Sequence, residues 1–430
     1  MKALVIGVGA LAVVGGGAYA QYSMNQVIES ELVKMTDAEL ISRQAGMPVT
    51  VTHSDQKSGL FSSSGSVVYS SEIPEHDGSM EILIDYKLDH SVLSGVQYET
   101  TFKDIRVLGE MAFSATDDLF NGKQIRVVGE MEGKGATGQA MIPAMRIEED
   151  GATILSAPAF PMDFSVQGFD VDPLIGSYTA SFVLPTMDIH SPEGTVSLEG
   201  LNWSQGYEGD DKGLMGDFAM SIAKIANQSA NPMMGFELNN LSLGMDTRIG
   251  ADVLGTLELK LASVTSAMGA VSDLSLKTRT GGVDGGILKD FLMKANQLQM
   301  AGPSEAGTKE LEQFLTDNLD PLLAPSPYFE IEQLQFDMNG QRFVEASGKV
   351  ALQSDKLPKD YFSSLFQQKM APDETLMMSA MSANLNSSFG PQAAMMIGPL
   401  HPMLMAVLQS GEPISFQLEN GQMMLNGQPL

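Results

Sequence analysis

The segment of residues 80–89 reads MEILIDYKLD and decides the fold class. Its alternate residues, from Met80 to Leu88, are all apolar, and four of the five residues that follow them are charged. Side chains of a β-strand point alternately to opposite faces, so this period of two predicts a half-buried strand with one wet face. Residues 49–51, 178–184, 257–261 and 417–425 alternate similarly, between clusters of Gly, Asn, Asp and Pro. We therefore expect a large antiparallel sheet.

Internal repetition supports this expectation. The segment IRVLGEM at residues 105–111 returns as IRVVGEM at residues 125–131, which predicts two neighbouring strands of similar design. A second pattern, apolar at positions 1, 3, 6 and 8, begins at Val196, Phe236 and Phe329. An apolar face that slips by one residue midway is typical of a β-bulge, which bends and twists a sheet. The alternative is chance in a chain rich in Leu, but the pattern favours a curved sheet.

Three segments have helical spacing or composition. Apolar residues recur every three or four positions over residues 287–298 and again over residues 311–322, where Pro321 kinks or ends the helix. Residues 375–411 contain no charge, and the apolar run 393–408 within them is interrupted by two prolines. This run is too short and too bent to span a bilayer, so we expect it to be buried against the concave side of the sheet, with a lipid-facing element as the alternative. Its methionines make it the candidate lipid-facing segment: Met395, Met396, Met403 and Met405.

The N-terminus resembles an export signal. Lys2 precedes an uncharged apolar run over residues 3–20, which as a helix would be about 27 Å long, close to the roughly 30 Å of a bilayer core. The charges that follow are net acidic, so the positive-inside rule places the N-terminus in the cytoplasm and the body outside it. Residues 18–20, Ala-Tyr-Ala, also fit a cleavage site that would release a soluble periplasmic protein. Both alternatives, a retained anchor and cleavage after Ala20, predict an exported body.

Composition excludes several classes of protein. The chain has 430 residues, no cysteine, and 53 acidic against 25 basic residues, for a formal net charge of -28. Such a charge repels nucleic acid, so no nucleic-acid partner is expected. The absence of cysteine excludes disulfides, thiol catalysis, thiolate metal sites and a lipoprotein anchor.

No catalytic motif is found. The five histidines lack metal-site spacing, and no nucleophile elbow, phosphate loop or dinucleotide fingerprint is present. The acidic residues Glu208, Asp210 and Asp211 lie among glycines, but they lack the EF-hand pattern and fit a solvated turn better. We therefore predict no catalytic, cofactor-binding or metal-binding residues and no cofactor.

Both ends of the body resemble a known family. The segment KSGLFSSSG at residues 57–65 and the closing segment NGQMMLNGQPL at residues 420–430 are similar to the opening and closing motifs of the YdgA family of uncharacterised bacterial proteins. The resemblance implies a protein held at the inner membrane, facing the periplasm, with no assigned reaction. One departure is His90, which is followed by Ser-Val where the family tends to have Gly-Pro. The motif residues, which we interpret as structural, are Gly59, Leu60, Phe61, Ser62, Ser63, Gly65, His90, Asn420, Gly421, Leu425, Asn426 and Gly427.

Physical chemistry suggests how these motifs act. Gly59 and Gly65 are expected to bracket a tight turn, with Phe61 as a core residue and the serines capping the turn. Asn420-Gly421 is a strong type I′ signal between two apolar runs, so the C-terminus is expected to be a hairpin.

These observations predict a mainly β (α+β) protein: a transmembrane or signal helix, then a large curved antiparallel sheet with a few packing helices. The expected divisions are a signal-anchor (1–21), an amphipathic helix (22–45), a β-rich region (46–283), a helical pair (284–325) and a C-terminal β/α region (326–430). The leading hypothesis is a non-enzymatic inner-membrane protein with its body in the periplasm, where a concave surface binds lipid or a membrane-protein partner. The alternatives are a structural protein that self-associates, as a homo-oligomer, through sheet edges, and a hydrolase with a carboxylate site.

Overall fold

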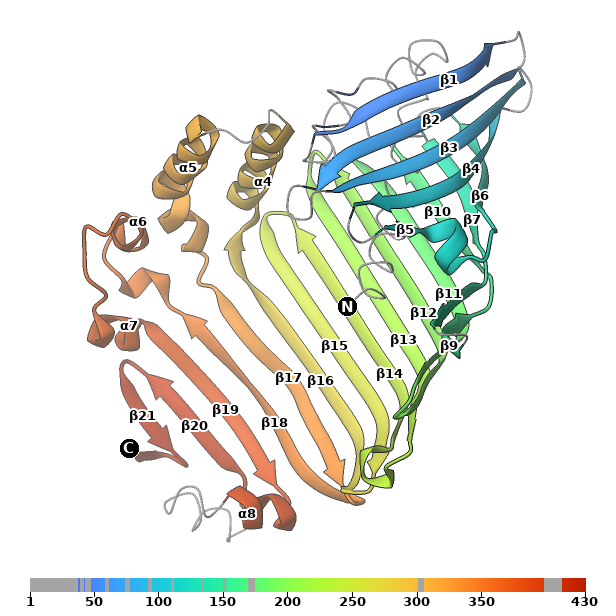
Figure 1. Cartoon of the computed structure of the whole chain (residues 1–430). Coiled ribbons are helices and arrows are strands. Elements are labelled where there is room, and N and C mark those ends of the chain that lie inside the picture. The colour runs from blue at the N-terminus through green and yellow to red at the C-terminus, as the bar shows by residue number, and fades with distance from the viewer. Residues whose placement is uncertain are drawn as a thin grey trace. The chain divides into compact units, whose positions relative to one another are not determined.

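A computed structural model describes residues 38, 42, 48–58, 62–73, 78–91, 95–109, 112–132, 135–149, 152–168, 175–300, 305–397 and 412–430. These residues form two compact units (Figure 1). Unit 1 takes the described residues up to Pro192 together with those in 199–210 and 296–303. Unit 2 takes residues 193–198, 211–295 and the described residues from 304 onward. The boundary thus falls inside the predicted β-rich region 46–283.

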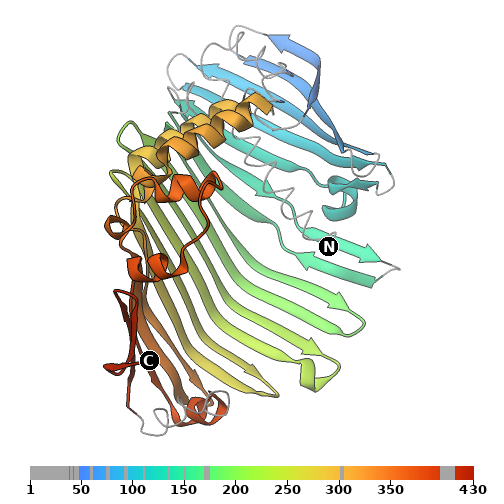
Figure 2. The same ribbon diagram turned by 90° about the vertical axis from the view of Figure 1, so that its left-hand side faces the viewer.

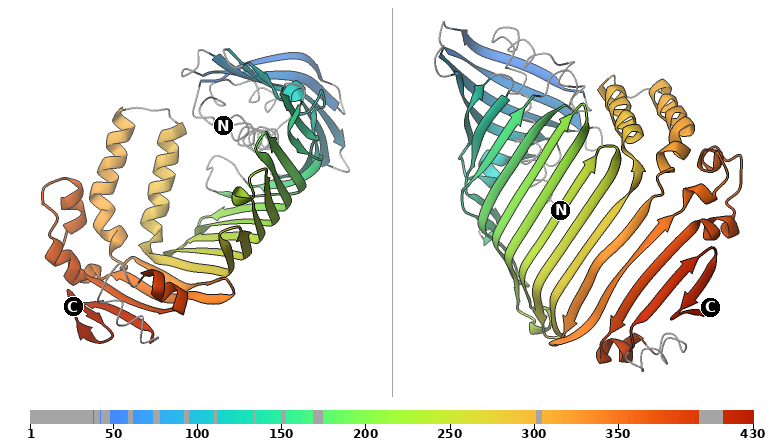
Figure 3. Two further views of the ribbon diagram at one scale, coloured as in Figure 1. Left: turned by 60° about the horizontal axis from the view of Figure 1, so that its bottom comes forward. Right: turned by 180° about the vertical axis from the view of Figure 1, so that it is seen from behind.

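Unit 1 is an antiparallel sheet. Its strands are β1 (Thr50–Ser58), β2 (Ser62–Ile73), β3 (Gly78–Ser91), β4 (Gly95–Leu108), β5 (Phe113–Ser114), β6 (Ile125–Glu132), β7 (Gly135–Ile142), β8 (Met145–Glu149), β9 (Ala152–Ala157), β10 (Phe160–Gln167) and β11 (Gly176–Ser191). They pair in the order β1–β2–β3–β4–β6–β7–β10–β11, and the β8–β9 hairpin joins the far end of β11. A π-helical turn, η3 (Ala115–Leu119), lies between β5 and β6. The strands of this unit curve round in Figure 3 (left).

One face of the unit 1 sheet carries a hydrophobic core. Val67, Ile84, Phe102 and Ile125 lie directly opposite one another on β2, β3, β4 and β6. Each of the four is at most 6% exposed. Directly paired residues of an antiparallel sheet point to the same side, so the alternation in residues 80–89 becomes one row of this core. Burial of each such side chain stabilises the fold by about 1.5–3 kcal/mol.

Unit 2 is a meander of antiparallel strands with helices inserted between them. Its elements are β13 (Gly213–Ser229), η4 (Pro232–Met234), β14 (Phe236–Ile249), β15 (Asp252–Ser266), β16 (Gly269–Asp284), α4 (Gly285–Met300), α5 (Glu305–Leu323), β17 (Tyr328–Met338), β18 (Gln341–Leu352), η5 (Ser354–Lys356), α6 (Tyr361–Phe366), α7 (Glu374–Ala380), β19 (Met381–Phe389), α8 (Pro391–Ile397), β20 (Ile414–Glu419), β21 (Gln422–Leu425) and β22 (Gln428–Pro429). Strand β12 (Gly194–Asp210) and helix α4 have residues in both units. Figure 2 shows the long strands of the meander following one another.

The meander puts alternate connections at opposite ends of unit 2. Helices α4 to α7 gather at the end where β16 and β18 finish (Figure 1). Helix α8 and the turns after β13, β15 and β17 lie at the other end. The predicted helical pair is confirmed as α4 and α5, which meet through Phe291 and Phe314, whose ring centroids are 6.0 Å apart. Pro321 lies in the last turn of α5, where a proline ends a helix without breaking it midway.

Other predictions fall partly or wholly outside the described residues. The signal-anchor 1–21 lies outside them, and of the amphipathic helix 22–45 only Ala38 and Ser42 are described as helical. Helix α8 confirms the start of the predicted helix 393–408, and the remainder lies outside. In the described part of the chain no helix combines the length and the hydrophobicity needed to cross a bilayer.

The two repeated sequence patterns correspond to features of the structure. The first marks two paired strands, and the second marks strands whose alternation is interrupted. Strands β4 and β6, which carry the two copies of the IRV segment, pair directly. The slip in the 1-3-6-8 pattern is a register shift between Ile331 and Leu334 in β17. In β12 and β14 the fifth position of the pattern is instead a left-handed residue, Gly200 with φ 63° and Asn240 with φ 51°. A left-handed residue is the other way to interrupt the alternation of a strand, and Gly and Asn adopt that conformation most readily.

The expected role of Gly65 is wrong. It lies inside β2, directly opposite Tyr86 of β3, whereas the turn is expected between Ser58 and Ser62. A Cβ at position 65 would lie 2.7 Å from the Tyr86 hydroxyl and 2.8 Å from Nε2 of His53. Those two side chains are hydrogen-bonded at 2.9 Å. Position 65 is therefore glycine because the side chains of His53 and Tyr86 meet where its Cβ would lie. The serines that follow Phe61 belong to strand β2 rather than to a turn.

Candidate functional site

The strongest candidate site is one face of the unit 2 sheet, which we call the apolar face. It is built from residues that lie directly opposite one another across eight strands, β13 to β20. One row contains Phe218, Met245, Leu257, Thr278, Ile331, Gly348, Leu385 and Phe416. The row beside it contains Met220, Leu243, Leu259, Leu276, Leu334, Ala346, Ser387 and Ile414. Since paired residues share a face, these rows form a continuous strip that is almost wholly hydrocarbon and thioether.

The opposite face of the same strands is polar. The row that follows the second apolar row along the strands points to this face and contains Ser221, Ser242, Lys260, Ser275, Gln335, Glu345 and Ser388. Lys260 forms an ion pair with Glu258 at 2.6 Å, and Lys277 forms one with Glu332 at 2.6 Å. The sheet is therefore amphipathic, with one polar face suited to solvent and one apolar face suited to a hydrophobic contact.

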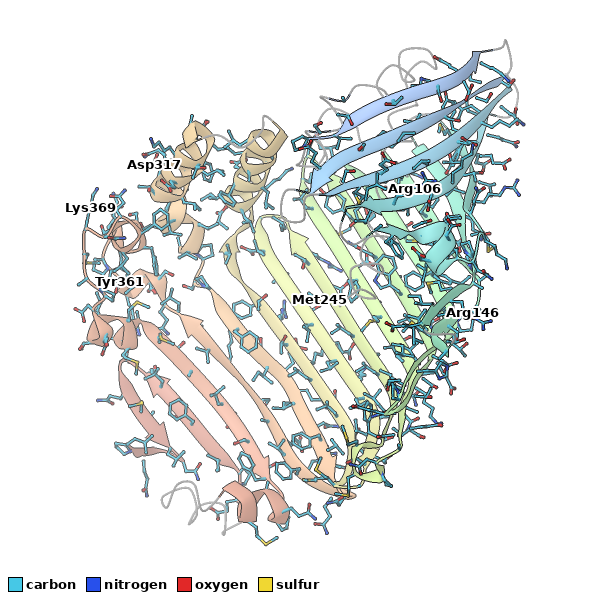
Figure 4. All side chains as sticks on the ribbon, viewed as in Figure 1. Arg106, Arg146, Met245, Asp317, Tyr361 and Lys369 are labelled. Carbon is cyan, nitrogen blue, oxygen red and sulfur yellow. The ribbon has the colours of Figure 1, made fainter. Side chains whose placement is uncertain are left out.

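Much of the apolar face is not buried. Met245 is 43% exposed, and Phe329, two residues along β17 from Ile331, is 46% exposed. Met245 is labelled in Figure 4 among the side chains of the neighbouring strands. Most other residues of the two rows are half-buried. Single exposed apolar residues are ordinary on protein surfaces, but a contiguous apolar strip that is only half-buried is a candidate binding surface. Leu and Met side chains have no strong hydrogen-bond donor or acceptor, so the face can recognise hydrocarbon but cannot perform acid-base chemistry.

The described titratable residues show neither a metal cluster nor a carboxyl group with a clearly raised pKa. No group of three or more His, Asp or Glu within the described ranges could hold a metal ion. Among the described residues two carboxyl groups have a clearly shifted pKa, and both shifts are downward. The pKa of Glu237 is lowered mainly by its hydrogen bond from Lys224. A general acid needs a raised pKa, so both groups fit structural ion pairs better.

Asp104 is the most connected of these groups. Its carboxylate accepts hydrogen bonds from Nε of Arg106 at 2.7 Å, from the Ser114 hydroxyl at 2.8 Å and from the Thr116 amide at 3.0 Å. Burial raises its pKa, but the hydrogen bonds from Arg106, Thr116 and Ser114 outweigh that effect and leave the pKa below its usual value. The network ties β4 to β5 and η3.

Replacing Asp104 by Asn should lower the stability of unit 1 by about 2 kcal/mol at pH 7, because hydrogen bonds to a buried charge are lost. A lowered folded-state pKa stabilises the fold above the unfolded pKa of about 4, and that contribution is lost as the pH falls through the folded value. The deficit of the variant should therefore shrink below about pH 4. Urea unfolding of the wild type and the variant, at several pH values between neutral and acid, measures this difference in stability. The control is Asp85→Asn, because Asp85 pairs with Lys103 at a more exposed position and should change stability less.

Two depressions on unit 1 are acidic. One, of about 640 Å³, is lined by Glu130, Glu208 and the backbone of several glycines, including Gly168 and Gly176. The other lies between Asp89, Glu99, Glu130 and Asp163, where Gln139 donates a hydrogen bond to Asp163 at 2.8 Å. Of the acidic residues noted in the sequence, Glu208 and Asp210 belong to β12 and Asp211 to the turn after it. Acidic side chains alone do not make a site, and the described residues offer no further ligand-binding feature there.

Where they are described, the motif residues lie in several separate strands and turns. Gly59, Leu60 and Phe61 lie outside the described residues, Ser62 and Ser63 belong to β2, and His90 pairs with Val96 in the β3–β4 ladder. The predicted C-terminal hairpin is confirmed as β20 and β21, with φ of 52° at Asn420 and 76° at Gly421. The second Asn-Gly, at residues 426 and 427, makes another such turn into β22, with φ of 48° and 76°. Leu425 lies opposite Phe416 in the hairpin.

The candidate lipid-facing methionines are only partly described. Met395 of α8 is 71% exposed, which contradicts burial of this residue against the sheet. Its neighbour Ala393 is fully buried, so α8 packs through its alanine face. Met396 lies in α8, and Met403 and Met405 lie outside the described residues. Sequence reasoning missed the apolar face as a unit, because its residues come from eight strands that only the register brings together.

A comparison with protein families tests the resemblance of the two end motifs. A family model described as a bacterial protein of unknown function (DUF945) matches residues 1–430. The chain belongs to this family. The family includes YdgA, so the resemblance of the two end motifs is confirmed. Searches of curated proteins and of solved structures find no match.

Proposed function

We propose that this DUF945 protein is a non-enzymatic, membrane-tethered envelope protein whose apolar face binds the acyl chains of lipid. The observation that supports this most is the strip of paired residues, mostly Leu, Ile, Met and Phe, that crosses eight strands and stays partly exposed. In this proposal residues 1–21 anchor the chain in the inner membrane and the described body lies in the periplasm. The export-like N-terminus and the acidic body support this placement.

The chemistry of the face favours acyl chains over a polar ligand. Across β13 to β16 the two rows offer Leu, Met and Phe side chains with a single hydroxyl, that of Thr278. A fluid chain can lie along such a strip without shape complementarity to particular residues, and each buried CH₂ contributes about 0.8 kcal/mol. The net charge of -28 disfavours anionic headgroups, so neutral or zwitterionic lipids are the expected ligands.

Self-association through sheet edges, the alternative, has less support. Edge strand β1 is interrupted by a register shift between Ser54 and Lys57, with Asp55 in a left-handed conformation. In unit 2, β22 has two residues and ends in Pro429. Bulges, charged residues, short strands and proline are the devices that prevent edge pairing.

A matched pair of substitutions tests the proposal. Met245 and Met215 lie on the adjacent strands β14 and β13 and are 43% and 46% exposed. Met245 belongs to the apolar face, whereas Met215 shares the polar face with Asp217 and Ser221. We expect Met245→Glu to lower the amount of co-purified lipid about tenfold, because a carboxylate would have to be desolvated beside the chain. Met215→Glu should leave it unchanged.

The measurement is native mass spectrometry of the full chain purified from a bacterial envelope in mild detergent, followed by lipid extraction. Lipid at a defined stoichiometry in the wild type and in Met215→Glu, but not in Met245→Glu, supports the proposal. Wild-type protein with no bound lipid contradicts it, as does equal binding by both variants.

A further inference from the structure

The two ends of the unit 2 strands differ sharply in charge. At the end where β13, β15, β17 and β19 finish, the chain carries no Asp, Glu, Lys or Arg over residues 225–236, 261–272, 338–341 and 389–397. We call these four segments the uncharged end. The strand ends and connections at the opposite end contain Asp211, Lys212, Arg248, Asp252, Asp284, Asp355, Lys356, Lys359 and Asp360. Because 18% of the residues in the chain are charged, four uncharged segments at the same end are a marked asymmetry between the two ends of the meander.

The uncharged end also holds the most exposed apolar side chains. Among the described large hydrophobic residues, Met268, Met395 and Met233 are the three most exposed, at 82%, 71% and 63%. Met234 of the same turn as Met233 is 57% exposed, and Phe236, the first residue of β14, is 38% exposed. The methionines come from the turn η4, the β15–β16 turn and α8, which Figure 1 shows at the same end of unit 2.

The turns that carry these side chains are well ordered by hydrogen bonds. The Met233 amide donates to Oδ1 of Asn231 at 3.1 Å, and Asn227 donates to the Met234 carbonyl at 2.9 Å. The Ala270 amide donates to Oδ1 of Asn339 at 3.0 Å, which joins the β15–β16 turn to the β17–β18 turn. Polar backbone groups are thus satisfied internally, a requirement for entering the apolar part of a membrane.

The charges that border this end are paired. Lys224 and Glu237 form an ion pair at 2.8 Å, and Arg342 and Asp273 form one at 2.9 Å. Glu193 also borders this end, and its carbonyl accepts a hydrogen bond from the Ala230 amide. An end with neutral segments and paired bordering charges has no attraction for anionic lipid but can approach a neutral or zwitterionic surface.

We propose that the uncharged end docks on a zwitterionic bilayer by inserting Met233, Met234, Met268 and Met395 into the headgroup and upper acyl region. A bilayer suits these side chains better than a protein partner does. They project from separate turns, and a fluid phase accepts separated flexible side chains, whereas a stable protein interface needs roughly 800 Å² of complementary surface on each partner. This docking is distinct from the anchor at residues 1–21 and from acyl-chain binding to the apolar face, and it would bring that face to its source of lipid.

The absence of cysteine makes the test direct, because a single introduced thiol can be labelled in the full chain. Met268→Cys carries an environment-sensitive nitrobenzoxadiazole label, and Met215→Cys near the start of β13 serves as the control. Met215 lies toward the charged end and is 46% exposed. The chain is reconstituted into phosphatidylcholine vesicles, and iodide quenching of the label is measured.

We expect the label at position 268 to be quenched at least threefold less than the label at 215 when vesicles are present, and equally without them. Because no charge attraction is involved, the protection should persist in about 0.5 M salt. Adding Met233→Asp and Met234→Asp should restore quenching at 268. Equal quenching at both positions in vesicles would overturn the proposal, as would protection that depends on protein concentration without vesicles, which would indicate a second copy as the partner. Protection at 268 in a protein that binds no lipid would keep this inference and reject the proposed function.

Discussion

Replacing Gly129 by alanine is expected to lower the stability of unit 1 by about 3 kcal/mol or more, although it adds only one methyl group. Gly129 of β6 lies directly opposite Gly138 of β7, and this glycine pair lies between Tyr98 of β4 and Phe164 of β10. A Cβ at position 129 would lie 2.1 Å from the Thr137 carbonyl oxygen and 2.5 Å from the Tyr98 hydroxyl. The first of these atoms is backbone, so relief requires the β6–β7 ladder itself to move.

The matched control is Gly244→Ala in β14. Gly244 is also a strand glycine with an ordinary φ, and a Cβ there would meet no heavy atom within 4 Å. Alanine restricts the unfolded chain more than glycine does, so this variant should be unchanged or more stable by about 0.5 kcal/mol. Urea unfolding followed by tyrosine fluorescence and circular dichroism compares the two. A midpoint for Gly129→Ala equal to that of the wild type would show that the strands can separate at little cost.

A second comparison separates backbone from side-chain crowding. A Cβ at Gly138 would meet the Tyr98 hydroxyl at 2.4 Å, and a ring atom of Phe164 and the Val128 carbonyl oxygen at 2.8 Å each. Its closest clash is thus with a side chain, so Tyr98→Leu should partly rescue Gly138→Ala. The same change should not rescue Gly129→Ala, because the Thr137 carbonyl stays in place.

Local periodicity was enough to predict the strands and the helical pair. Residues 80–89 alternate so regularly that a single strand face follows from them, and the register turns that face into a row of the core. Helices α4 and α5 follow from apolar spacing in the same way. Both signals arise within a few consecutive residues, where the geometry of one strand or helix decides which side chains share a side.

Features that depend on register could not be predicted. Gly129 sits in the repeated IRVVGEM segment as the counterpart of Gly109, yet Gly109 follows the end of β4 with φ 126° while Gly129 pairs inside β6. The role of Gly65 was misread for the same reason, because Tyr86 lies 21 residues away in sequence. The apolar face is the extreme case, since Leu243, Leu259 and Leu276 become neighbours only through two strand pairings. Non-local pairing is a property of the whole sheet, and a window of sequence does not contain it.

The family's closing motif is expected to act on folding rather than on function. Its two Asn-Gly pairs supply the left-handed residues of two successive type I′ turns, so the motif specifies β21 and β22 as the end of the unit 2 sheet. The first turn is held further by Lys356, whose Nζ donates to Oδ1 of Asn420 at 2.6 Å. The second is held by Asn426, whose Oδ1 accepts from the Ser415 amide at 2.7 Å.

Deleting residues 420–430 should therefore lower the stability of unit 2 by about 3 kcal/mol and make the protein prone to aggregate. The deletion removes the four β20–β21 residue pairs and leaves β20 as an unprotected edge. That edge carries Leu418, which is 6% exposed in the intact protein and lies opposite Met423 of the deleted strand. Thermal unfolding and light scattering measure the two effects.

Removal of Leu430 alone is the control, because its side chain is 60% exposed and both turns remain. It should shift the unfolding temperature little, since only the hydrogen bond from its amide to the Met423 carbonyl is lost. Unchanged thermal stability and solubility after deletion of all eleven residues would mean that the hairpin is not part of the folded sheet. A loss of lipid binding without a loss of stability would instead assign the motif to the apolar face, to which Met423 and Leu425 are joined through Leu418 and Phe416. The two readouts together decide whether the motif specifies the fold or the ligand-binding surface.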